Sequence, residues 1–140
     1  MMRKNYDSIG YYILVILMFF QGLSGTFGGA VLMLDPSGAL IQLPPAMLEG
    51  TPFPDFLIPG IILFTILGFF PLAVAVGLWK KWKWSWFGAL LVSVALIIWI
   101  EVEIILVGYQ PDPPLQLIYG LVGLLLLILV LLPPVKRTLV

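Results

Sequence analysis

The segment from Phe56 to Val107 decides the fold, and it reads FLIPGIILFTILGFFPLAVAVGLWKKWKWSWFGALLVSVALIIWIEVEIILV. Two apolar runs, residues 56–79 and 86–107, are joined there by the short basic stretch KKWKWS. Each run provides the about 20 residues that an α-helix needs to cross a hydrocarbon core of ~30 Å. Because the connection is so short, the two predicted helices are antiparallel neighbours.

Two more apolar runs flank this pair, at residues 9–34 and 115–132. Of the 140 residues, 61% are hydrophobic and 10% are charged, a composition that is incompatible with an ordinary soluble surface. The sequence therefore predicts an all-α integral membrane protein, in which residues 1–140 form a single domain, a bundle of four transmembrane helices.

The charged residues are segregated between the connections of the four runs. All seven basic residues lie before the first run, between the second and third, or after the fourth: Arg3, Lys4, Lys80, Lys81, Lys83, Lys136 and Arg137. Six of the seven acidic residues lie on the opposite side: Asp35, Glu49, Asp55, Glu101, Glu103 and Asp112. Because Lys and Arg near helix ends remain in the cytoplasm, we expect a multi-pass protein of the cytoplasmic membrane with both termini inside. So complete a bias disfavours an antiparallel dimer.

Tryptophans gather at the predicted inner boundary: Trp79, Trp82, Trp84 and Trp86. Indole rings prefer the headgroup level of a bilayer. The mixed basic and aromatic stretch at residues 80–84 is therefore interpreted as an interface anchor that attracts anionic lipids, and not as a nucleic-acid site.

The outer loop, residues 35–55, combines five prolines with several large apolar side chains. Asp35-Pro36-Ser37-Gly38 is typical of a type I turn, and residues 45–49 predict one helical turn that ends at Gly50. We expect an ordered cap in the outer interface. It serves either as structural cover for the helix ends or as a lid or docking surface for a partner.

The predicted helices also carry packing signals. The first has a stripe of small and polar residues: Gln21, Gly22, Ser24, Gly25, Gly28 and Gly29. The spacing Gly25-x-x-x-Gly29 favours close helix contact inside the bundle, with an oligomer seam as the alternative. In the second helix, Pro71 removes a backbone hydrogen bond, which predicts a kink beside Gly68.

Two carboxylates, Glu101 and Glu103, lie within the predicted third helix. They are separated by about 200° of rotation, so they cannot form an acid/base dyad. Glu103 shares its arc with small residues and is expected to face the bundle, whereas Glu101 lies among bulky aliphatic residues that face lipid. Glu101 therefore reaches up to the interface, contacts a partner protein or takes part directly in chemistry.

Glu103 is the centre of a predicted polar pocket in the outer half of the bundle. The other predicted lining residues are Gln21, Ser24, Thr65, Gln116 and Tyr119. No basic residue is available there, so such a pocket favours a proton or a cationic or hydrogen-bonding ligand. The alternative is a structural network of satisfied hydrogen bonds.

The chain has no histidine and no cysteine, which removes disulfides, imidazole catalysis and the usual zinc and haem ligands. No nucleophile with a base partner is visible. We therefore expect no catalytic residues, no metal site and no cofactor.

Four strings carry a resemblance: LDPSGAL (residues 34–40), LEGTPFPDFLIPG (48–60), GYQPDPPLQLIYG (108–120) and LLPPVKR (131–137). They resemble an uncharacterised family of small four-helix, multi-pass membrane proteins of bacteria and archaea. The resemblance covers most of the chain. It implies the four-helix architecture but neither a substrate nor a catalytic residue.

These observations leave two classes of function open. The favoured hypothesis is a non-enzymatic structural or accessory component that assembles with itself or with a larger membrane complex, with membrane lipids and no nucleic acid as partners. The alternative is a small transporter or channel of parallel copies, or a binder of lipid or another small ligand, that uses the pocket around Glu103.

Overall fold

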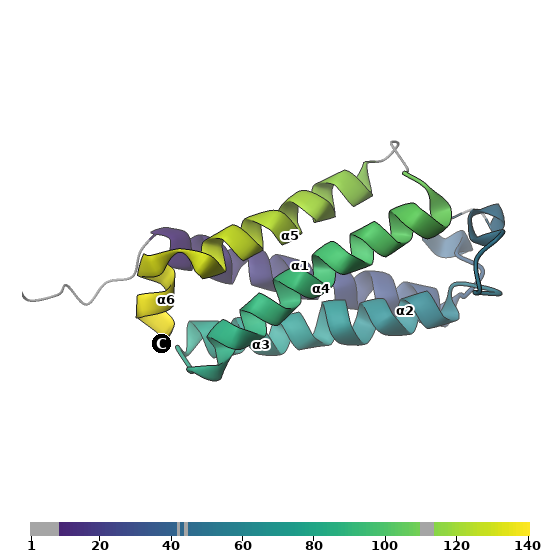
Figure 1. The fold of residues 1–140 in the computed structure, drawn as a ribbon. Helices are drawn as coiled ribbons and strands as arrows, with labels where there is room; N and C mark the ends of the chain where they lie inside the picture. Colours follow the sequence, from purple (N-terminus) through teal and green to yellow (C-terminus); the bar gives the residue numbers. More distant parts are fainter. Residues whose placement is uncertain (1–8, 42, 44, 110–113) are drawn as a thin grey trace, which may run out of the picture.

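The computed structural model describes residues 9–41, 43, 45–109 and 114–140, and within these ranges every regular element is a helix. The helices lie side by side in an elongated arrangement (Figure 1). In chain order they are α1 (Ile9–Leu34), η1 (Ala39–Ile41), η2 (Pro45–Leu48), α2 (Leu57–Phe64), the π-helix η3 (Thr65–Phe69), α3 (Phe70–Trp79), α4 (Trp84–Val107), α5 (Leu115–Leu131) and α6 (Pro133–Leu139).

Three helical segments are long and apolar enough to cross a membrane: α1, the continuous segment Leu57–Trp79 and α4. They agree closely with the predicted runs 9–34, 56–79 and 86–107. The fourth run differs from the prediction, because α5 has 17 residues and the chain bends by 70° before α6. Leu132 is extended ahead of two prolines, and proline disfavours helical backbone in the preceding residue. The structure thus contains three helices that are long and apolar enough to span a membrane, or four if α5 and α6 form one broken span.

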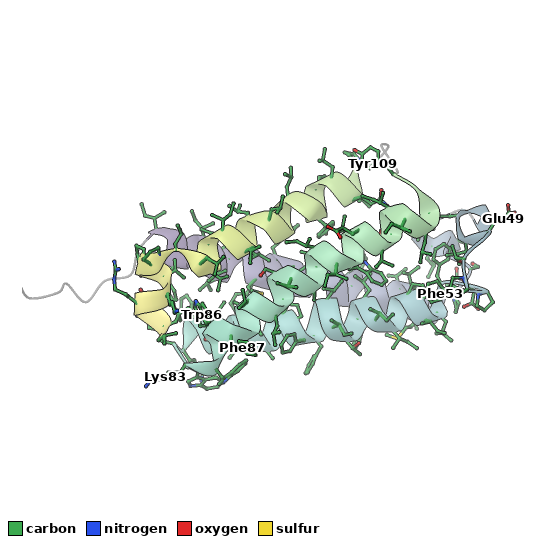
Figure 2. All side chains as sticks on the ribbon, in the orientation of Figure 1. Glu49, Phe53, Lys83, Trp86, Phe87 and Tyr109 are labelled. Atoms are coloured by element: carbon green, nitrogen blue, oxygen red, sulfur yellow. The ribbon has the colours of Figure 1, made fainter. Side chains whose placement is uncertain are left out.

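The basic and the acidic connections lie at opposite ends of the molecule. The α3–α4 hairpin and α6 lie at one end, where Figure 2 labels Lys83 and Trp86. The outer loop and the C-terminal end of α4 lie at the other, where Glu49 and Tyr109 are labelled. The predicted positions at Arg3, Lys4 and Asp112 lie outside the described residues.

Glycines in α1 bring its backbone into contact with the second span. A Cβ atom on Gly25 would lie 2.0 Å from the carbonyl oxygen of Leu67, and one on Gly29 would lie 2.4 Å from the amide nitrogen of Phe64. On the facing side, a Cβ on Gly68 would lie 2.5 Å from the Thr26 nitrogen. The glycine stripe therefore packs within the chain, as the favoured interpretation predicts.

The predicted irregularity at Pro71 takes the form of the π-helix η3, which precedes this proline directly. The Phe70 N–H donates to the carbonyl of Thr65, five residues earlier. Since proline has no N–H, it cannot donate to the Leu67 carbonyl, four residues before it. Gln21 Nε2 of α1 donates to this oxygen instead, at 2.9 Å.

The outer loop is ordered and apolar, as expected, wherever the structure describes it. Leu32, Leu48 and Phe56 form a small buried cluster. The predicted turn closes with a hydrogen bond of 3.0 Å from the Gly38 N–H to the Asp35 carbonyl. The predicted helical turn is η2, and Gly50 follows it with a φ of +81°. The loop thus covers the ends of α1 and α2.

Candidate functional site

A polar cluster ties the C-terminal end of α4 to the N-terminal end of α5. Glu103 is half-buried, and its carboxylate accepts hydrogen bonds from the side chains of Trp99 and Gln116. Gln116 is 5% exposed, and its Nε2 also donates to the carbonyl of Gly108 at 3.2 Å. Two of the predicted pocket residues, Glu103 and Gln116, are therefore brought together, with Trp99 as a third member.

The other predicted pocket residues occupy different contacts. Gln21 is buried against η3 through its bond to Leu67, and Ser24 Oγ donates to the Gln21 carbonyl within α1 at 3.2 Å. The Tyr119 ring stacks on Phe20, with ring centroids 5.9 Å apart. Gln21 and Tyr119 thus hold α1 against its neighbours, and these contacts do not involve Glu103.

For Thr65 the prediction of a pocket-lining side chain is wrong. This residue is exposed, and its hydroxyl donates to the Ile61 carbonyl of its own helix at 2.7 Å. Thr65 follows Gly60 by five positions, which turns it about 140° away from that buried glycine.

The structure separates the two carboxylates of α4 as expected. Glu101 is exposed, next to the exposed Val102, whereas Glu103 is partly covered. The role of Glu101 as a partner contact stays a prediction.

Two further cross-helix bonds were not foreseen from the sequence. The Tyr11 hydroxyl of α1 donates to the Leu78 carbonyl of α3 at 2.6 Å, and Trp86 Nε1 of α4 donates to the Val130 carbonyl of α5 at 2.8 Å. Val130 lies in the last turn of α5, which ends at Leu131, and carbonyls in a last turn have no donor within their own helix. The proline pair that ends α5 was the available sequence signal for this carbonyl.

The opposite end of the molecule carries a shallow hollow of about 270 Å³, lined by Pro133, Lys136, Arg137 and Val140. The Lys136 ammonium lies 4.8 Å from the ring centroid of Trp86. Within the described residues, no group of three or more acidic side chains is placed to hold a metal ion. The chemistry that this protein presents is thus a carboxylate cluster at one end and a basic, aromatic surface at the other.

No family model, curated protein or solved structure matches this chain. The resemblance carried by LDPSGAL and the three other strings stays a prediction.

Proposed function

We propose that this chain is a non-enzymatic structural or accessory component of a membrane assembly, which spans the bilayer four times with both termini in the cytoplasm. One observation carries the proposal: several polar side chains of the apolar helices bond to a neighbouring helix. Gln21, Tyr11 and Trp86 each donate to a backbone carbonyl of a neighbouring helix. Glu103 of α4 and Gln116 of α5 join their helices by a contact between two side chains.

The physical reason is that a bilayer core offers no water to satisfy backbone polar groups, so unpaired carbonyls there are costly. Side chains committed to such carbonyls hold helices in fixed positions. A transport path needs the opposite arrangement, in which polar groups line a water-filled cavity. The bonding pattern therefore favours a rigid component over a conducting one.

The proposed topology can be tested because the natural chain has no cysteine. Single cysteines are introduced at Ser37, in the outer loop, and at Val140, beyond α6, and are exposed to a membrane-impermeant maleimide in right-side-out vesicles. We expect labelling of Ser37→Cys in intact vesicles and of Val140→Cys only after permeabilisation. Labelling of both in intact vesicles would mean that α5 and α6 do not cross, leaving three spans.

The proposed role is tested on the exposed face of α4. A photo-crosslinking amino acid is placed at Glu101 and, as a matched control, at Phe27, which is 69% exposed on α1. In native membranes we expect a discrete crosslinked product from position 101, to a second copy or to another membrane protein, and none from position 27. A chain that gives only lipid adducts at both sites and remains monomeric in nanodiscs would contradict an assembly role.

A transporter, channel or ligand binder remains the second candidate, and Glu103 is the observation that favours it. A half-buried carboxylate beside an indole is a reasonable site for a cation or proton. In liposomes reconstituted with the purified protein, our proposal expects no proton or monovalent-cation flux above protein-free controls. Flux that is abolished by Glu103→Gln would establish the second candidate instead.

A further inference from the structure

The end of the molecule that holds the α3–α4 hairpin and α6 carries all the basic residues that the structure describes: Lys80, Lys81, Lys83, Lys136 and Arg137. All five side chains are exposed, and they come from two segments far apart in the sequence. The Lys136 ammonium over the Trp86 ring, at 4.8 Å, joins these segments. They form one continuous surface, which we call the basic end.

The fold of α6 gives this surface its shape. The 70° bend after α5 turns α6 across the end of the helices. Val135 and Leu139 are buried beneath it, while Lys136 and Arg137 point outward. The shallow hollow of about 270 Å³ opens beside these two cations. It is slightly smaller than the roughly 300 to 1000 Å³ typical of pockets for whole small molecules, a size suited to a headgroup.

Apolar and aromatic groups border the basic end. Trp79, Trp82 and Trp84 are all exposed, at 63%, 46% and 48%. Two of these rings also lie together, with centroids 6.2 Å apart for Trp82 and Trp84, and Lys80 lies 5.5 Å from the Trp82 centroid. Leu131, at the end of α5, is 54% exposed. A ligand that combines an anionic group with apolar chains matches this arrangement.

Four of the five cations at this end are without an ion pair within the described residues. No carboxylate is within ion-pair distance of Lys80, Lys83, Lys136 or Arg137 in the part of the chain that the structure describes. In addition, Lys81, just after α3, has a φ of 58°. Its N–H and that of Trp82 donate hydrogen bonds to carbonyls in the last turn of α3 and so close the helix end. Glycine is the usual residue in that left-handed position. The Lys81 ammonium lies 5.5 Å from the ring centroid of Tyr11.

We propose that the basic end is a binding site for an anionic phospholipid, with the phosphate headgroup in the hollow beside Lys136 and Arg137 and the acyl chains along the exposed surface of α5. The inference rests on the proposed membrane location. Basic pockets at the cytoplasmic side of membrane helices bind anionic headgroups in this way. The exposed tryptophans fix the depth of the site, because indoles settle at the headgroup level.

Lipid binding at this end can be followed by tryptophan fluorescence, since four of the five tryptophans in the chain lie there. The protein is reconstituted into liposomes that contain brominated phosphatidylglycerol or brominated phosphatidylcholine, and quenching of tryptophan fluorescence gives the relative association constant of each lipid. One contact with Lys or Arg corresponds to about five-fold in affinity. We expect the wild-type protein to prefer the anionic lipid by at least about five-fold.

Three comparisons make the test specific. The variant K136Q/R137Q is expected to lose most of this preference, whereas the charge-preserving variant K136R/R137K keeps it. Inorganic phosphate at matched ionic strength is expected not to displace the brominated anionic lipid. Equal quenching by the two lipids in the wild type, an unchanged preference in K136Q/R137Q, or displacement by inorganic phosphate would each overturn the proposal.

The two proposals fail in different ways. If the protein is removed from liposomes by alkaline carbonate, the proposed membrane-spanning role fails, whatever the lipid. If it stays inserted but shows no lipid preference, only the lipid site fails.

Discussion

Replacing Gly25 with alanine is expected to lower the free energy of unfolding by about 3 kcal/mol, the upper end of the usual cost of overpacking. The added methyl group would lie 2.0 Å from the Leu67 carbonyl oxygen and 2.6 Å from its carbon. Those atoms belong to the backbone of η3, so no side-chain rotation relieves the clash. Either α1 separates from the second span or η3 is displaced. The change is measured by titrating the protein in mixed micelles with sodium dodecyl sulfate.

Gly28 provides the matched control for this prediction. It lies on the same helix, but a Cβ there meets only the tip of the Leu63 side chain, at 3.3 Å. Both substitutions gain the same intrinsic helix propensity from alanine, about 1 kcal/mol, so the difference between the variants isolates the backbone clash. We expect Gly28→Ala to leave stability within about 1 kcal/mol of wild type. Equal stability of the two variants would show that α1 and η3 are not in close contact.

The long apolar helices were predictable because crossing a bilayer requires one length and one composition. The ends of α1 and of Leu57–Trp79 follow directly from the hydropathy of the chain, and the charged connections follow from the same pattern. The glycine contact was also predictable, since only small residues permit such an approach. The segment lengths depend on one segment and its solvent, and the glycine contact depends only on residue size along one face of α1.

The polar pocket was harder to predict because it depended on the rotation of four helices at once. Gln21 was expected beside Glu103, yet it is held by the Leu67 carbonyl that Pro71 leaves without a donor. Thr65 was expected to point inward, yet its hydroxyl is satisfied within its own helix. Helix rotation here follows from backbone carbonyls that need donors, and a pattern of polar residues does not contain that information.

The α6 segment was missed for a related reason. Its sequence, PPVKRTL, reads as a polar tail after the last apolar run. Val135 and Leu139 are four positions apart, a helical spacing that puts both on one face, and both are buried. A proline pair at the first helical positions is a recognised start signal. The segment was overlooked because hydropathy averaged over a membrane-length window hides a helix of seven residues.

The pairing of Gln21 with Pro71 leads to the last prediction, a double-mutant cycle. Gln21→Leu removes the donor to the Leu67 carbonyl and leaves this oxygen unpaired, so it is expected to cost about 1 kcal/mol, within the range measured for hydrogen bonds between membrane helices. Pro71→Ala restores an N–H four residues after Leu67, which can donate to the same oxygen. In that background Gln21→Leu should cost almost nothing, because the carbonyl already has a partner.

The cycle also separates this hydrogen bond from general packing around Gln21, whose side chain is 1% exposed. Its Oε1 is buried and makes no hydrogen bond within the described residues, so Gln21→Leu also removes a group that is itself costly to bury. The stability gained by removing this unpaired oxygen is the same with or without Pro71, so it cancels in the coupling energy. A coupling near 1 kcal/mol, measured with the same detergent titration, would tie Gln21 to the carbonyl that Pro71 leaves unpaired. Equal costs in the two backgrounds would mean that Gln21 contributes by filling space and that Leu67 finds its donor elsewhere.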